Sequence, residues 1–217
     1  MATRSLVVVS AGLGSPSSTR LLADRLAAAV DRLLRDAAID PTVEVIELRE
    51  HAHDLTNNLL TGFPSPSLQA AIDRVVEADG LIVVGPIFNA SYSGLFKLFF
   101  DVLERDGLAG MPVLIAATGG TARHSLALEH AVRPLFAYLN AAVVPTAVYA
   151  ASEDWGQAGV AADGSLVERI ERAARELSVT IATREPRGRA DPFDETGGFG
   201  EMLDALEKKG TGHRSSG

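Results

Sequence analysis

The chain has 217 residues, of which 47% are hydrophobic, and this length suits one domain with a sizeable buried core. Its formal net charge of −8 argues against DNA or RNA as a partner, because nucleic-acid phosphates are bound by clustered Lys and Arg. The absence of cysteine excludes disulfides, cysteine-ligated metals and thiol catalysis. The N-terminal apolar run 6–9 is too short for a signal peptide or a membrane span, so a cytoplasmic protein without membrane attachment is expected.

Apolar runs alternate with amphipathic stretches from the N-terminus to residue 183. Short runs of apolar, often β-branched residues predict buried parallel strands at 5–10, 43–48, 80–85, 113–117 and 143–149. Apolar residues at helical spacing predict helices over 18–37, 68–76, 95–103, 125–140 and 166–183. The intervening segments are predicted to be loops at 51–66, 86–93, 118–124 and 152–164. This alternation predicts an α/β, flavodoxin-like three-layer sandwich with a five-stranded parallel sheet of order 2-1-3-4-5.

The composition changes at about residue 184, where Pro, Gly and charged residues become dominant. Such a segment has too little apolar surface to form a packed core. The predicted organisation is therefore one domain over 1–183 followed by a flexible polar tail over 184–217, in which 201–209 has the pattern of one short helix.

Glycine and hydroxyl residues gather directly after the first predicted strand. In doubly wound sheets ligands bind at the carboxyl ends of strands where the strand order reverses, which here means the loops after strands one, three and four. The first of these loops leads into a helix N-terminus, where backbone N–H groups and the helix dipole favour a phosphate monoester. The alternative is ordinary helix capping, and the spacing matches neither a Walker A loop nor Gly-x-Gly-x-x-Gly. The candidate phosphate-binding residues are Ser15, Ser17, Ser18, Thr19 and Arg20.

The loops after the third and fourth strands carry residues suited to a flat heteroaromatic ring. In the loop after the third strand, apolar, amide and hydroxyl groups can lie along the edge of such a ring and form hydrogen bonds with its rim. In the loop after the fourth strand, paired glycines allow the backbone to approach the ring closely. The alternative for the first of these two loops is a capped helix start, and for the second a glycine-rich turn. The candidates are Pro86, Ile87, Phe88, Asn89, Ala90 and Ser91 in the former loop, and Thr118, Gly119 and Gly120 in the latter.

Three further clusters stay open or are set aside on sequence grounds. Arg123 and His124 either contact a cofactor or a neighbouring subunit, or simply lie on the surface. The run 153–155 (Glu-Asp-Trp) either lines the pocket rim, forms a dimer contact, or is a solvated loop. The segment 51–54 (His-Ala-His-Asp) suggests metal ligands, but no further well-placed ligand accompanies it and no metal is expected.

The run 86–97 (PIFNASYSGLFK), together with 117–121 (ATGGT), resembles the NAD(P)H-dependent FMN reductases, and most closely the reductase components of two-component flavin monooxygenase systems. The resemblance covers about residues 6–181. It implies a flavoprotein oxidoreductase in which NADPH or NADH passes a hydride to FMN. It also implies that the FMN phosphate lies on the first loop, the isoalloxazine against the second, and the polar edge of the ring near the paired glycines. The family often has an arginine near the start of the first loop, whereas here it comes late, as Arg20.

The resemblance further implies an assembly and a partner. Such reductases form homo-oligomers, dimers or tetramers, and those of two-component systems supply FMNH2 to a flavin-dependent monooxygenase. In the sulfonate-system reductases a tyrosine at the place of Tyr92 accompanies a π-helical bulge at a subunit interface and is linked to flavin exchange; a plain core or interface aromatic is the alternative. Because the hydride passes between two cofactors, no catalytic side chain is required.

Other functions are compatible with the same fold. A quinone or azo reductase that holds FMN tightly is the main alternative. A flavodoxin-type electron carrier is less favoured, because the loops contain few flanking aromatic residues and the net charge is only moderately negative. A flavin-free binding module is a further alternative, because fold alone does not determine function.

Overall fold

The computed structural model describes residues 2–157 and 164–187. The chain divides into two compact units, Met1–Pro186 and Arg187–Gly217, and every helix and strand described below belongs to the first. From residue 188 onward, the tail predicted over 184–217 lies outside the described residues, as does the short helix predicted over 201–209.

The sheet has seven strands, and its parallel strands follow the order β2-β1-β3-β5-β6, with β7 also paired to β5 and β4 antiparallel to β3. Because β6 and β7 together occupy the place of the fifth predicted strand, the predicted order 2-1-3-4-5 is confirmed, whereas the predicted count of five is not. That strand is interrupted at Pro145, which has no N–H to donate to a neighbour. The strands are β1 (Ala2–Ser10), β2 (Ile39–Glu47), β3 (Gly80–Phe88), β4 (Ser91–Tyr92), β5 (Pro112–Gly119), β6 (Ala142–Val143) and β7 (Val148–Ala151).

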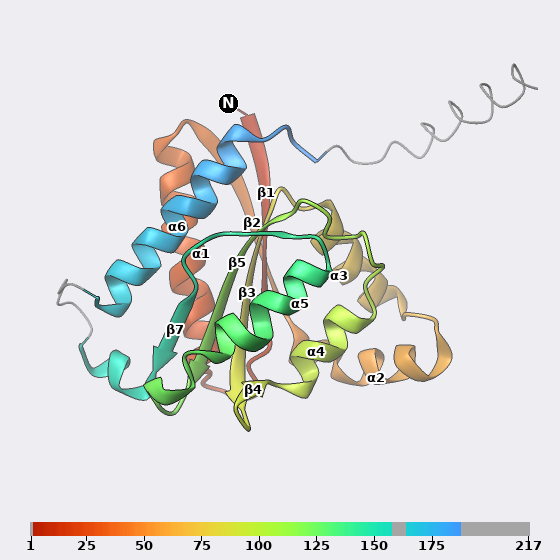
Figure 1. Ribbon diagram of the computed structural model, residues 1–217. Coiled ribbons are helices and arrows are strands. Elements are labelled where there is room, and N and C mark those ends of the chain that lie inside the picture. Colours follow the sequence, from red (N-terminus) through yellow and green to blue (C-terminus); the bar gives the residue numbers. More distant parts are fainter. Residues whose placement is uncertain (1, 158–163, 188–217) are drawn as a thin grey trace, which may run out of the picture. The chain divides into compact units, whose positions relative to one another are not determined.

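Helices cover both faces of the sheet (Figure 1), with α1 and α6 on one face and α3, α4 and α5 on the other. Successive side chains of a strand point to opposite faces, so Val7 packs in the core beneath α3 and α4 while Val8 packs beneath α1 and α6. The helices are α1 (Ser18–Asp36), α2 (Ala52–Thr61), α3 (Pro66–Glu77), α4 (Gly94–Asp101), α5 (Arg133–Tyr138) and α6 (Leu166–Thr183), with 3-10 turns at Leu48–His51, Ala122–His124 and η4 (Ser152–Gln157) and a π-helix at Leu128–Val132.

Serine caps fix where the two long helices begin. The Ser17 hydroxyl accepts a hydrogen bond from the Arg20 amide at 3.2 Å, and the Ser165 hydroxyl accepts one from the Glu168 amide at 3.2 Å. These caps satisfy first-turn amides that have no intrahelical acceptor. Within the described segments, no helix has both the length and the apolarity needed to cross a membrane.

Two predicted loops are regular structure instead. The segment 51–66 contains α2, which ends at Gly62 with φ of 79°; this helix buries only Leu55 and Asn58, so its sequence shows no apolar stripe. The segment 86–93 contains the end of β3 and all of β4, which form a tight hairpin. Asn89 and Ala90 have φ values of 48° and 67°, as the two central residues of a type I′ turn require.

The predicted helix over 125–140 is only partly regular. Its first residues lead into the π-helix Leu128–Val132, and only Arg133–Tyr138 is α-helical. The apolar spacing of the segment therefore predicted a helical stretch correctly but did not distinguish π-helical from α-helical hydrogen bonding.

Candidate functional site

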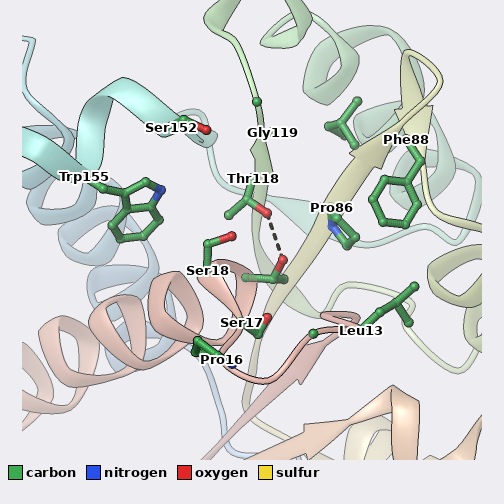
Figure 2. Close-up of a pocket in the computed structure, with 14 residues that line it drawn as sticks. Leu13, Pro16, Ser17, Ser18, Pro86, Phe88, Thr118, Gly119, Ser152 and Trp155 are labelled. Atoms are coloured by element: carbon green, nitrogen blue, oxygen red, sulfur yellow. Dashed lines mark hydrogen bonds between the residues drawn. The ribbon is translucent and has the colours of Figure 1, made fainter.

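One cavity of about 400 Å³ lies at the carboxyl ends of β1, β3 and β5 (Figure 2), within the range usual for small-molecule sites. All three loops singled out by the sequence contribute to it. None of the described side chains that line the cavity carries a charge. The cavity is lined by Leu13, Gly14, Pro16, Ser17, Ser18, Thr19, Pro86, Ile87, Phe88, Thr118, Gly119, Gly120, Ser152 and Trp155.

The N-terminus of α1 forms one wall of the cavity. This helix has 19 residues and no acidic side chain in its first turn, so its dipole and first-turn amides face the cavity without a competing negative charge. The loop must approach closely here, because a Cβ on Gly12 would overlap the Ser17 hydroxyl and come within 3.1 Å of Thr19 Cβ. A glycine at position 12 therefore lets the loop fold under the helix and form an anion-binding cradle.

A hydroxyl pair joins the helix to the third loop. Thr19 Oγ1 and Thr118 Oγ1 lie 2.8 Å apart, and both side chains are buried (Figure 2). A buried hydroxyl without a partner is destabilising, so each threonine satisfies the other. The contact fixes the distance between the α1 N-terminus and the end of β5, two walls of the cavity.

The backbone of the third loop rests on Tyr149. The Tyr149 hydroxyl donates to the Thr121 carbonyl at 2.9 Å, and a Cβ on Gly119 would overlap that hydroxyl. Burial, and then the nearby Asp154 carboxylate, raise the pKa of Tyr149 above its ordinary value, so it is a neutral donor near pH 7. Gly119 is therefore required because the loop lies directly on this phenol.

A further wall comes from η4, which an ion pair holds in place. Arg169 Nη2 contacts Asp154 Oδ1 at 2.6 Å, while Arg169 Nη1 donates to the Tyr149 carbonyl at 2.6 Å. Trp155 follows directly and packs under the Arg25 guanidinium, 5.1 Å from the ring centroid. These contacts place Trp155 and Ser152 at the cavity, so the open question about the run 153–155 is answered for Trp155.

Several predicted residues lie elsewhere. Asn89 and Ala90 form the hairpin turn, Ser91 pairs with Phe88 in β4, and none of the three lines the cavity. Ser15 lines a smaller neighbouring cavity of about 250 Å³, as does Arg20. The second loop therefore contributes only its first three residues, because the chain turns away after Phe88.

Arg20 is directed at carboxylates, not at the cavity. Its Nε lies 2.7 Å from Asp24 Oδ1, and its Nη1 contacts Glu47 Oε1. Hydrogen bonding to Asp24 is the largest cause that raises the pKa of Arg20, with Glu47 contributing further. The guanidinium is thus already neutralised on the far side of the first loop.

Sequence reasoning missed the apolar and small residues of the first loop and the serine of η4. Leu13 is a half-exposed apolar side chain at the cavity, and Figure 2 shows it on the same side as Phe88, which was predicted. Gly14 and Pro16 complete the loop, and Ser152 follows β7. Their positions in the sequence could have identified these residues, because each lies beside a strand that ends at the ligand-binding edge of the sheet.

Tyr92 lies in β4, paired with Ile87, and its ring stacks on Phe96 with a centroid distance of 5.9 Å and an interplanar angle of 28°. The helix that follows it is a regular α-helix, and the π-helix lies instead at Leu128–Val132. The π-helix is thus in a different helical segment from the one that follows Tyr92, but it contacts β4, the strand that contains Tyr92; a role of Tyr92 in assembly and flavin exchange stays a prediction.

The remaining clusters lie outside the cavity. Arg123 and His124 line a separate cavity of about 380 Å³ beside Ala90. Asp54 accepts a hydrogen bond from the Ser65 hydroxyl at 2.7 Å. Among the residues that the structure describes, no three His, Asp or Glu side chains are grouped so that they could hold a metal ion.

Comparison with known proteins defines the class. Residues 5–156 match the family described as NADPH-dependent FMN reductase, and the chain belongs to this family. It is 39% identical over 179 residues to an FMN reductase (NADPH) of Pseudomonas aeruginosa, covering 82% of this chain and 93% of that protein. It is 38% identical over 174 residues to the NADH-dependent FMN reductase SfnF of Pseudomonas putida, covering 80% and 90%. A solved oxidoreductase of Corynebacterium diphtheriae has a TM-score of 0.81 and 44% identity, covering 85% of this chain and all of that chain.

Family membership confirms the resemblance read from the motifs. The protein is an oxidoreductase of the flavodoxin-like fold with FMN and a nicotinamide cofactor as its reactants. The cavity fits a phosphorylated flavin on three grounds: its size, its neutral lining and a helix N-terminus whose loop leaves no room for a Cβ on Gly12.

Proposed function

We propose that the protein binds FMN in this cavity, reduces it with NADPH or NADH, and supplies reduced FMN to a partner flavin-dependent monooxygenase. The phosphate lies at the α1 N-terminus, against the hydroxyls of Ser17, Ser18 and Thr19. The ring lies against the segment 86–88, with its polar edge at Gly119 and Gly120. These residues and Thr118 all line one cavity, whereas the predicted candidates Ser15, Arg20, Asn89, Ala90 and Ser91 do not.

One observation carries this proposal: the cradle at the α1 N-terminus and the two ring-binding segments meet in a single cavity. The buried contact of Thr19 with Thr118 fixes their separation, so an elongated ligand with an anionic end is oriented by the frame alone. A phosphate without a side-chain cation is held by backbone N–H groups, hydroxyls and the helix dipole.

The protein itself binds the flavin, orients its ring and tunes the electronic properties of that ring. Bound FMN supplies the hydride-accepting ring. Apolar groups of Leu13, Pro86, Phe88 and Trp155 line the cavity and exclude water from the ring. Backbone N–H groups at Gly119 and Gly120 lie where negative charge on the ring rim is stabilised. No described lining side chain is a titratable acid or base, which agrees with a reaction that needs none.

We also propose that the protein assembles as a homo-oligomer. Leu60, near the end of α2, and Phe63, two residues after that helix, are 81% and 80% exposed. Large exposed apolar side chains in proximity mark interaction surfaces. Light scattering coupled to gel filtration tests this; a monomer at micromolar concentration would contradict it.

Steady-state oxidation of NADH and NADPH, titrated with FMN, FAD and riboflavin, tests the reductase function. FMN is expected to support turnover at the lowest concentration, because only its terminal phosphate monoester fits the cradle. Equal efficiency with riboflavin would contradict a phosphate-binding first loop. Gel filtration of the loaded protein then separates the roles: loss of FMN supports a diffusible product, whereas retained FMN favours a quinone or azo reductase.

A charge variant with a matched control tests the position of the phosphate. Ser18→Asp places a carboxylate at the first residue of α1, where it is expected to weaken FMN binding by at least about tenfold through like-charge repulsion. Ser18→Asn has nearly the same shape without the charge and is expected to change FMN affinity far less. Because an acidic residue in the first turn stabilises a helix, the loss of affinity should occur without loss of stability.

A further inference from the structure

A charged cluster lies directly behind the proposed phosphate cradle. The neighbouring cavity of about 250 Å³ shares Gly14, Pro16 and Ser17 with the FMN cavity, so one loop separates the two. The far side of this smaller cavity is lined by four charged side chains, Arg20, Asp24, Glu47 and Arg49.

Glu47 is the centre of this cluster. It is the last residue of β2 and lies opposite Ser10 in the parallel register, so it ends at the same edge of the sheet as the first loop. One carboxylate oxygen contacts Arg20 Nη1, and the other lies 2.8 Å from Arg49 Nε. Arg49 Nη1 in turn donates to the Gly14 carbonyl at 3.3 Å, which ties the cluster to the loop.

Arg20 stands where a phosphate-binding arginine would be useful. It is the third residue of α1, one turn from the Ser17 cap, and an arginine there can form strong paired hydrogen bonds with phosphate oxygens. In the structure its Nε and Nη1 instead meet Asp24 and Glu47. The cradle is therefore left without a side-chain cation.

We propose that Glu47 is a positioning residue that holds Arg20 away from the phosphate cradle and thereby lowers the affinity for FMN. This inference rests on the proposed function, since it concerns the phosphate of the same ligand. Weak phosphate binding suits a reductase whose flavin must leave for another enzyme. A free arginine at the cradle would hold the flavin as a resident group.

Of the two carboxylates, Glu47 has the larger role. Its side chain is 17% exposed and binds two guanidinium groups, whereas Asp24 is 49% exposed and binds one at the adjacent helix turn. Water screens an exposed carboxylate strongly, so Asp24 contributes less to holding Arg20. Removing Glu47's charge should therefore release Arg20 more than removing that of Asp24.

Paired affinity measurements test the inference. The dissociation constants of FMN and riboflavin are measured by quenching of flavin fluorescence for the native protein, Glu47→Gln, Arg20→Gln and the double variant. Glu47→Gln is expected to strengthen FMN binding about threefold or more, because the released Arg20 can then bind phosphate oxygens, with riboflavin within about twofold of native. Arg20→Gln alone should change FMN affinity less than about twofold, and in the Glu47→Gln background it should remove the gain.

The control is Glu171→Gln, which removes a carboxylate paired at 2.6 Å with Arg32, farther along the same helix. It is expected to leave both affinities unchanged. Asp24→Asn should give a smaller gain in FMN affinity than Glu47→Gln. Thermal melts of each variant show that the fold is retained.

Three results would overturn these assignments. A tenfold loss of FMN affinity in Arg20→Gln, with riboflavin unchanged, would mean that Arg20 binds the phosphate directly. Equal weakening of both flavins by Glu47→Gln would reduce Glu47 to a support of the loop; if that variant does not fold, Arg20→Gln alone decides. Equal affinity of the native protein for FMN and riboflavin would overturn the proposed phosphate cradle itself, and the role of Glu47 with it.

Discussion

Replacing Gly119 with alanine should destabilise the protein through one specific collision. The new Cβ would overlap the Tyr149 hydroxyl and lie 3.1 Å from its Cζ. Relief requires the buried phenol to move, at a cost of about 2 kcal/mol for overpacking. The movement also breaks the hydrogen bond to the Thr121 carbonyl, which contributes about 1 kcal/mol. The free energy of unfolding should fall by about 3 kcal/mol, which lowers the melting temperature by about 6–12 °C in a domain of this size.

Urea unfolding at 25 °C measures this change, and a second substitution tests its cause. Tyr149→Phe alone should cost about 1 kcal/mol, the value of the lost hydrogen bond. In the double variant the Cβ no longer meets a hydroxyl, so what remains is the lost hydrogen bond and the 3.1 Å approach to the ring carbon Cζ, about 2 kcal/mol in total, and the double variant should be more stable than Gly119→Ala alone. Gly120→Ala is the matched control, since nothing lies within 4 Å of its Cβ, and it should cost less than about 0.5 kcal/mol. A double variant less stable than Gly119→Ala would refute the reasoning.

Three further predictions concern the residues that support the loops around the cavity. Gly12→Ala should weaken FMN binding and destabilise α1, because the new Cβ overlaps the Ser17 hydroxyl that caps this helix. Fluorescence titration measures the loss of FMN affinity, and circular dichroism measures the loss of helix stability. Thr19→Val and Thr118→Val should each cost about 1–3 kcal/mol in urea unfolding, and the double variant less than their sum, because each single change leaves a buried hydroxyl unpaired. The pKa of Tyr149 is raised in the folded protein, so its contribution to stability is fully present below pH 10 and is lost as the pH rises through the folded-state value; tyrosinate absorbance and alkaline unfolding of the native protein and Tyr149→Phe measure this.

The sequence predicted the long elements well because their signals are local. The final helix was predicted over 166–183 and is observed as Leu166–Thr183, and α1 begins at Ser18 as predicted. In both cases a serine cap precedes an amphipathic repeat, and both signals lie within one turn of the boundary. Strand order was also predictable, since alternating strands and helices permit few arrangements with right-handed crossovers.

Where local signals were absent or unusual, the prediction failed. The segment containing α2 exposes Leu59 and Leu60, so its apolar residues do not define a buried stripe and a polar loop was the natural interpretation. The β3–β4 turn has Ala90 at φ of 67°, where glycine is the residue that usually marks such a hairpin. In the structure α2 contacts α4, and β4 contacts the π-helix; such tertiary contacts cannot be read from a single sequence.

The candidate site, too, was predictable where local sequence signals were sufficient and not where they were absent. Residues on the loops that end β1, β3 and β5 were brought together because parallel strands present their carboxyl ends at one edge. The orientation of Arg20 was not predictable from its own loop, because its partner Glu47 comes from another strand. Yet that partner has a readable position, since Glu47 ends β2 and the register sets it opposite Ser10, where the first loop begins. In a sheet of this order, an acidic residue that ends the strand beside the first loop is therefore placed to pair with a cation on that loop, as Glu47 does with Arg20.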